Sequence, residues 1–223
     1  EEALRQTREE EETRMLTRLA TRLRQILGEQ SEINRLTIEV QEAFGGKESI
    51  EKLSATAGIA KREDDTAGIT DRAVRLLEED GKSIAFVEVL SQAHEDMLAV
   101  SQRLKSGSTD AITAAIEGEI VEALEDAIAA VDAKLAEKAN QEQQAQQQGQ
   151  QQSGSQEQSL VDMLAELRML KSLQTRILKR TQRYELQREA GELTPKAYAQ
   201  AMSGLSARQR RATQAAENLA EPE

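Results

Sequence analysis

A single histidine, His94, is the first side chain to consider for chemistry, because histidine serves as an acid-base group and a metal ligand near neutral pH. A zinc-protease helix needs a second histidine four residues later, and Leu98 stands there. His94 also falls on the apolar stripe of an expected helix. We therefore predict that His94 packs in a helical seam and bonds a neighbouring helix, with no metal site.

The segment FGGKES (44–49) has the glycines and lysine of a phosphate-binding loop but lacks its other parts. The first glycine of that motif would fall at Gln41, and Glu48 stands where Ser or Thr is needed. The chain has no cysteine, so thiol catalysis and cysteine-ligated metals are excluded. We expect a non-enzymatic protein with no catalytic residue, no cofactor and no small-molecule substrate.

Carboxylates and cations are unevenly distributed along this acidic chain, whose net charge is -11. Residues 159–223 contain 11 Lys or Arg and 8 Asp or Glu, whereas residues 1–158 contain 18 and 32. The carboxylates of residues 117–126 are expected to form a solvated face: Glu117, Glu119, Glu122, Glu125 and Asp126. A short RQRR segment (208–211) is expected to be solvated too. The candidate interaction face is a basic stretch with six cations: Arg168, Lys171, Arg176, Lys179, Arg180 and Arg183.

The basic stretch has three possible partners. Pairing within the molecule is favoured, because residues 107–142 carry nine Asp or Glu against two Lys, and flanking charges select partners in helix pairs. The alternative is a membrane-surface helix, although its apolar face has no Trp or Phe anchor. Nucleic acid is not expected, because the pI is about 4.9, aromatic residues make up 2% and no known reader motif is present.

The composition predicts long helices: 31% of residues are charged, only two are Pro, and Trp is absent. We expect an all-α fold, an elongated antiparallel coiled-coil or helical-hairpin bundle of about six helices. Residues 1–140 form a long helical coiled-coil region, and residues 141–158, with 11 Gln, form a linker. Residues 159–223 form a basic helical hairpin, whose second helix begins at Thr194 and Pro195. The first four helices are expected near 3–44, 50–79, 83–105 and 109–140.

Alternating spacings of three and four residues predict which residues form the helical seams. The first helix has the seam Leu16, Leu19, Leu23, Ile26, Gln30, Ile33, Thr37, Val40 and Phe44. The second has the apolar face Ile50, Leu53, Ala57, Ala60, Ile69, Ala73 and Leu76. The basic helix has the seam Leu160, Met163, Leu167, Leu170, Gln174, Ile177, Thr181 and Tyr184, so its six cations are expected to flank the seam.

Four consecutive segments together resemble a group of known proteins. They are AFVEVLSQAHEDMLAVSQRL, then EGEIVEALEDAI, a Gln-rich stretch and LVDMLAELRMLKSLQTRILKRT. The proteins of this group are uncharacterised exported or periplasmic helical coiled-coil proteins of bacteria, with an AELRMLxxLQ…RT-type helix after a Gln-rich linker. The resemblance covers residues 70–220. It implies a periplasmic or exported location, near membrane-protein complexes, and no assigned activity.

A functional expectation follows from these patterns. We expect a structural or adaptor protein that acts through helix–helix contacts with protein partners, with copies of itself, or with both. The chain begins at Glu1 and not at Met, so we expect a fragment or a processed product. A cytoplasmic location stays open.

Overall fold

Six helices account for the described part of the chain. The computed structural model describes residues 2–81, 83–147 and 154–220. The helices are α1 (Glu2–Phe44), α2 (Ile50–Asp80), α3 (Ile84–Lys105), α4 (Ala111–Gln147), α5 (Gly154–Glu189) and α6 (Pro195–Ala220). These ranges contain no strand. The predicted all-α class with about six helices is therefore confirmed.

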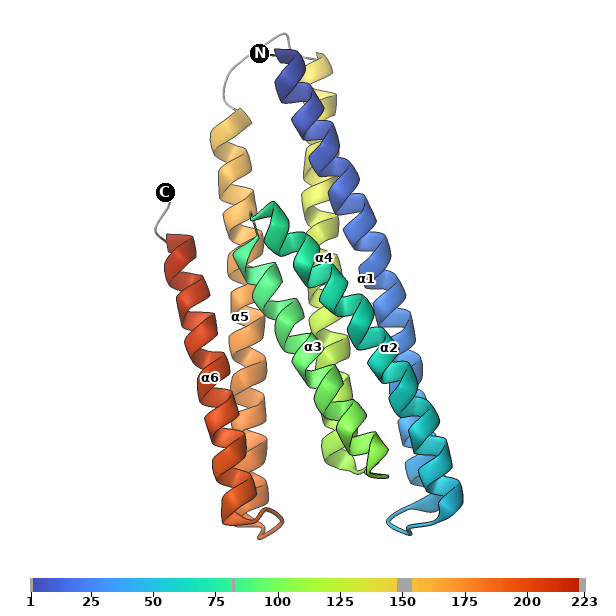
Figure 1. The fold of residues 1–223 in the computed structure, drawn as a ribbon. Helices are drawn as coiled ribbons and strands as arrows, with labels where there is room; N and C mark the ends of the chain where they lie inside the picture. Colours follow the sequence, from blue (N-terminus) through green and yellow to red (C-terminus); the bar gives the residue numbers. More distant parts are fainter. Residues whose placement is uncertain (1, 82, 148–153, 221–223) are drawn as a thin grey trace.

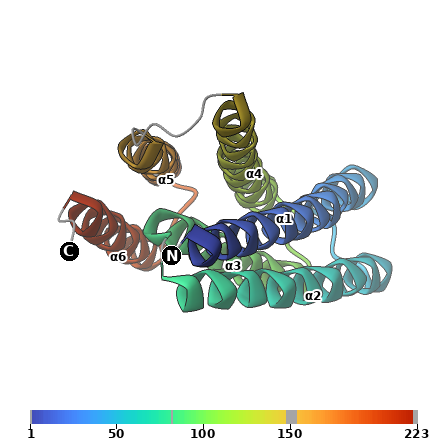
Figure 2. The ribbon, with the colours of Figure 1, turned by 90° about the horizontal axis from the view of Figure 1, so that it is seen from above.

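The helices run alternately up and down and form two four-helix groups that share α3 and α4 (Figure 1). In the first group, the contacts α1–α2, α2–α3, α3–α4 and α4–α1 close a ring. In the second group, α4–α5, α5–α6 and α6–α3 complete a ring with α3–α4, and α5 also packs on α3. Figure 2 shows the α5–α6 hairpin to one side of α1–α4. Helices α3 and α4 thus pack against other helices on two sides.

Glycines and hydroxyl residues delimit the helices largely where the sequence predicts. Gly45, after α1, has a φ of 58°, a left-handed conformation that glycine adopts without strain. Ser49 caps α2, since its side chain accepts a hydrogen bond from the Lys52 amide. Thr194 caps α6 in the same way, accepting from the Ala197 amide at 3.2 Å. These turns set the antiparallel order of neighbouring helices.

Helix α1 buries the seam that its sequence predicts. Leu23, Ile26 and Ile33 are fully buried. The two polar interruptions, Gln30 and Thr37, are fully buried as well. The long apolar stripe of α1 therefore faces α2 and α4, the two helices that it contacts.

Helix α2 buries only part of the predicted face, since Ala60 and Ala73 are buried as predicted. Ile50, Leu53 and Leu76 are exposed. The buried residues again alternate at spacings of four and three, but many are small or polar: Lys52, Thr56, Ile59, Glu63, Thr66, Thr70, Ala73 and Leu77. Threonine hydroxyls bond the preceding turn, as Thr66 does to the Arg62 carbonyl at 2.8 Å, so they enter the interior at little cost. The prediction from apolar residues alone is therefore wrong for Ile50, Leu53 and Leu76.

Helix α5 is also rotated relative to the prediction. Met163, Leu167 and Gln174 are exposed, although Leu170 and Ile177 are buried as expected. The buried residues follow seam spacing, and two of them are charged, Glu166 and Arg180. The other three are apolar: Leu170, Leu173 and Ile177. The prediction that all six cations flank the seam is therefore wrong for Arg180.

Helical structure reaches into both ends of the predicted linker (141–158). Helix α4 continues to Gln147, and α5 begins at Gly154. Glutamine and alanine both favour helix, so the Gln-rich composition does not by itself end α4. Residues 148–153 lie outside the described residues, and the domain boundaries stay a prediction. None of the described helices is long and apolar enough to cross a membrane.

Candidate functional site

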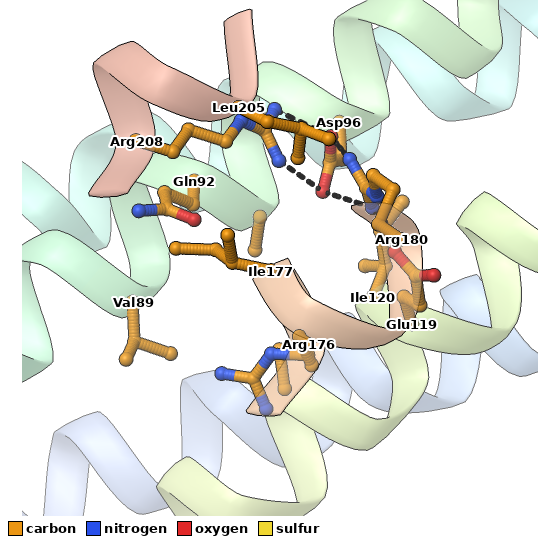
Figure 3. Close-up of a pocket in the computed structure, with 12 residues that line it drawn as sticks. Val89, Gln92, Asp96, Glu119, Ile120, Arg176, Ile177, Arg180, Leu205 and Arg208 are labelled. Atoms are coloured by element: carbon orange, nitrogen blue, oxygen red, sulfur yellow. Dashed lines mark hydrogen bonds and ion pairs between the residues drawn. The ribbon is translucent and has the colours of Figure 1, made fainter. Parts of the chain in front are cut away.

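A buried group of charged side chains lies where α3, α4, α5 and α6 meet. Asp96 of α3 is at its centre, and its carboxylate lies between two guanidinium groups (Figure 3). The Nη1 and Nη2 atoms of Arg180 donate to Asp96 at 2.7 and 2.9 Å. Those of Arg208, on α6, donate to the same carboxylate at 2.9 and 2.6 Å. One carboxylate thus binds two arginines, each through two hydrogen bonds.

Glu119 of α4 extends this group toward the other side of Arg180. The Nε atom of Arg180 donates to Glu119 at 2.6 Å, and its Nη2 atom also bonds this carboxylate. Arg183, one turn further along α5, donates to the second Glu119 oxygen at 2.6 Å. We call Asp96, Glu119, Arg180, Arg183 and Arg208 the ionic cluster. Its five side chains connect four helices.

Burial makes the geometry of the ionic cluster decisive for stability. The side chains of Asp96 and Arg180 are each only 9% exposed. Removing two charges from water costs several kcal/mol per ion, and close, fully hydrogen-bonded pairing offsets this cost. The planar guanidinium group suits this role, because its donors match the two oxygens of a carboxylate. The cluster therefore favours one arrangement of α5 and α6 on α3 and α4.

The local sequence places each member of the ionic cluster at an interior position. Arg180 follows Ile177 by three residues, so both lie on the inner face of α5. Asp96 precedes the buried Met97 in α3, and Glu119 precedes the buried Ile120 in α4. On α6, Arg208 follows the buried Leu205 by three residues. Each charge therefore enters the interior beside an apolar anchor.

Electrostatics hold the ionic cluster in its charged form. Burial pulls the pKa of Asp96 upward, but the charges and hydrogen bonds of Arg180 and Arg208 outweigh burial and leave the pKa below its ordinary value. Burial likewise opposes the charge of Arg180, yet Asp96 and Glu119 raise its pKa. A carboxylate held in this way has no proton to exchange near neutral pH, so Asp96 and Arg180 are poorly suited to acid-base catalysis.

A cavity of about 20 Å³ adjoins the ionic cluster and is lined by residues that include Val89, Ile177 and Leu205. This volume is close to that of one water molecule. A substrate or cofactor would not fit without movement of the helices. Both its size and its arginine-paired carboxylates favour a structural role for this centre.

The six cations of the predicted interaction face have different environments. Beyond the bonds of Arg180 and Arg183, Arg176 binds Asp126 at 2.9 Å, and Lys179 lies 3.4 Å from Glu122. Arg168 and Lys171 are exposed. These last two line a groove of about 360 Å³ between α4 and α5, together with Glu122, Glu125 and Asp126. Four cations therefore bind acids of the body, which is the pairing within the molecule that the charge distribution predicts.

Several functional residues differ from the sequence predictions. Glu117 and Glu119 are buried and not part of a solvated face. The RQRR segment is not simply solvated either, because Arg208 binds Asp96, and Arg211 binds Glu88 at 2.9 Å. The signal that could have revealed the buried acids is their place beside apolar seam residues. That signal is weak until the partner helices are known.

Sequence analysis also missed a contact at the start of α3. Glu166 of α5 accepts a hydrogen bond from the Ala85 amide at 2.6 Å, whereas the side chain of Ser83 makes no capping bond. A carboxylate at this position satisfies a free amide and interacts favourably with the positive end of the helix dipole. Glu166 therefore joins the N-terminal half of α5 to α3.

His94 does not behave as expected from the sequence. It is half-buried, and no hydrogen bond joins it to another helix within the described part of the chain. The described residues also contain no group of three or more His, Asp or Glu side chains that could hold a metal ion. His94 therefore offers no geometric support for a catalytic or metal-binding role.

The fold and the ionic cluster together define an all-α helical bundle held by a buried ion network. No family model, curated protein or solved structure matches this chain. The function must therefore be argued from the surface and the interior of this molecule.

Proposed function

We propose that the protein is a non-enzymatic structural or adaptor protein that binds other proteins through one face of α5. Among the described side chains of this helix, four leucines are exposed: Leu164 by 49%, Leu167 by 47%, Leu178 by 57% and Leu186 by 66%. At 3.6 residues per turn they fall on one side of the helix. We call these four leucines the outer face of α5, and this face is the observation that supports the proposal.

Single exposed leucines are ordinary on protein surfaces, but a row of them on one helix is less so. The inner face of α5 is already occupied, because Leu170, Leu173 and Ile177 are buried. Helix α5 is therefore apolar on two opposite sides. The second side presents apolar anchors to a helical partner, at separations of about one turn, three turns and two turns along the helix.

The ionic cluster supports this role by fixing the rotation of α5. Arg180 lies on the inner face and bonds Asp96 of α3 and Glu119 of α4. A rotation of α5 about its axis would remove Arg180 from both carboxylates. The cluster thus keeps the leucines of the outer face directed away from the body, where a partner can reach them.

A bacterial envelope assembly is the proposed setting. Its support is the sequence resemblance of residues 70–220 to exported helical proteins. A second candidate function is binding to an anionic membrane surface. It is favoured by Arg168 and Lys171, which are exposed beside Leu164 and Leu167. Four other cations of α5 already bind acids, which leaves less positive charge for lipid headgroups.

Site-specific photo-crosslinking in bacterial cells tests the proposal. A crosslinking amino acid at Leu178 should give discrete protein adducts, and the change Leu186→Asp in the same chain should abolish them. Ala199, an exposed residue on α6, is the matched control position and should give none. Sedimentation with anionic vesicles separates the two candidates. Vesicle binding without protein adducts at residue 178 would support the membrane function and exclude the adaptor function.

A further inference from the structure

Two carboxyl groups lie deep inside the first four-helix group, away from the ionic cluster. Glu63 of α2 and Glu117 of α4 are both fully buried. The Nε2 atom of Gln30 donates to Glu63 at 3.2 Å, and the Thr37 hydroxyl donates to Glu117 at 2.7 Å. Gln30 and Thr37 are the two polar residues in the seam of α1. Both carboxyl groups thus meet α1 through neutral partners.

The remaining oxygens of these carboxyl groups have no hydrogen-bond partner within the described part of the chain. This is true of Glu63 Oε1 and Glu117 Oε2. It is also true of two amide oxygens on the same side of α1, Gln30 Oε1 and Asn34 Oδ1. A buried ionised carboxylate without compensating partners is costly. A protonated carboxyl group is neutral, and it gains a hydroxyl that can donate to an amide oxygen.

Three ion pairs on the surrounding helices occupy charged groups elsewhere. Glu29 of α1 binds Arg62 of α2 at 2.8 Å. On the α3 side, Lys105 binds Asp64 of α2 at 2.7 Å. Between α3 and α4, Arg103 binds Asp110 at 2.7 Å. Within the described ranges, no Lys or Arg forms an ion pair with Glu63 or Glu117, in contrast to the carboxylates of the ionic cluster.

Proton affinity follows from this setting. Burial raises the pKa of Glu63, and the charges of the nearby Glu117 and Asp64 raise it further. The hydrogen bond from Gln30 lowers it in part, and the pKa of Glu63 is about 8. Burial also raises the pKa of Glu117, against the hydrogen bond from Thr37, to about 7. Both values lie well above 4.5, the ordinary value of a glutamate.

We propose that Glu63 and Glu117 form a buried proton-binding site, and that release of its protons near neutral pH loosens α1 from α2 and α4. The ligand is the proton itself, and each carboxylate takes up one proton from water on one of its two oxygens. The folded chain binds these protons more tightly than the unfolded chain. Their contribution to stability is therefore complete below pH 4.5 and is lost as the pH rises through 7 and 8.

Unfolding of the full chain by urea between pH 5 and pH 9, followed by circular dichroism, tests the proposal. The unfolding constant should rise by up to about tenfold per pH unit for each bound proton. Glu63→Gln and Glu117→Gln mimic the protonated groups, so each should reduce this rise and the double variant should remove it. Glu29→Gln is the control, because Glu29 is only half-buried and is paired with Arg62, and it should keep the slope of the parent.

Two further measurements locate the effect and its ligand. Hydrogen exchange in residues 26–40 of α1 should speed up from pH 6 to pH 8.5 beyond the intrinsic rise, and this excess should vanish in the double variant. Infrared spectra at pH 6 should show a carboxylic-acid carbonyl band that the double variant lacks. A flat stability profile in the parent, or an unchanged slope in the double variant, would overturn the proposal. So would a saturable stabilisation by NaCl or CaCl₂ at pH 8 that choline chloride does not reproduce, since the ligand would then be a metal cation.

Discussion

Arg180 of α5 and Asp96 of α3 form a two-fold hydrogen-bonded ion pair in the interior of the protein, with both side chains only 9% exposed. Arg208 of α6 binds the same carboxylate from the other side. A single aspartate therefore holds both helices of the C-terminal hairpin. The consequence is that stability of the hairpin should depend on Asp96 more than on any exposed ion pair.

Asp96→Ala should destabilise the protein by about 3–5 kcal/mol, because two guanidinium groups would remain in the interior without their carboxylate. Urea unfolding measures this loss. The matched control is Glu122→Ala, which removes the exposed partner of Lys179 and should cost less than about 1 kcal/mol. Equal effects of the two changes would show that the buried pair contributes no more than a surface pair.

Charge reversal within α5 should have very different effects at neighbouring positions. Arg180→Glu would place a third carboxylate beside Asp96 and Glu119 and should cost about 3–5 kcal/mol or more. Lys171→Glu and Lys179→Glu change exposed side chains and should each cost less than about 1 kcal/mol. Hydrogen exchange across residues 165–185 reads out the loosening of the hairpin. Similar exchange in all three variants would contradict the assignment of Arg180 to the inner face.

The sequence predicts the fold well where apolar residues define the seam. In α1, Leu23, Ile26 and Ile33 lie at seam spacing and are buried, so the pattern and the packing agree. The charge difference between the two ends of the chain also predicts that α5 pairs with α4. The seam prediction depends on the spacing of many apolar residues, and the pairing prediction depends on the net charge of long segments. A few residues that depart from the pattern therefore do not change either prediction.

Prediction is poorer where polar residues form the seam. Thr56 and Glu63 of α2, and Arg180 of α5, are buried because a partner helix supplies a hydrogen bond or a charge. The chain on its own does not reveal that partner. The central acid, Asp96, lies on α3 and not on the acid-rich α4, so net charge gave no indication of it. Which buried polar side chain pairs with which partner is decided only when the helices pack together.

The ionic cluster and the buried glutamates should respond to pH in opposite directions. Because the pKa of Asp96 is below its ordinary value, its contribution is present above the unfolded value of 3.8 and is lost as the pH falls through the folded pKa. Acid should therefore loosen α5 and α6 first, whereas alkaline pH should loosen α1. Hydrogen exchange at pH 3 and at pH 6, compared between the parent and Asp96→Asn, measures the acid effect in residues 165–185. If the parent and the variant respond identically, the acid response belongs to other carboxylates.

Helix α1 offers a matched pair of positions that tests its seam. Leu23→Asp would bury a charge among apolar side chains and should cost at least about 3 kcal/mol. Ile38→Asp makes the same kind of change on the same helix at a residue that is exposed, and it should cost less than about 1 kcal/mol. Thermal unfolding followed by circular dichroism measures both. Unchanged melting of the Leu23 variant would refute the seam.

Glu166 provides the last prediction, because its carboxylate lies at the N-terminus of α3 and accepts from the Ala85 amide at 2.6 Å. Ser83, the residue that precedes α3, makes no side-chain capping bond. Glu166→Ala would leave the amide without this acceptor and should cost about 1–2 kcal/mol.

The first turn of α3 reports this loss directly. Amide exchange of residues 85–88 should accelerate in the Glu166→Ala variant, while amides near Leu104, at the other end of α3, should keep their rates. Glu185→Ala is the control on the same helix, because Glu185 binds Arg188 and Tyr198 and not α3. If that control accelerates exchange at residues 85–88 as strongly, the effect arises from general loosening of α5. A selective effect of Glu166 would establish that α5 completes the N-terminus of α3 across the helix interface.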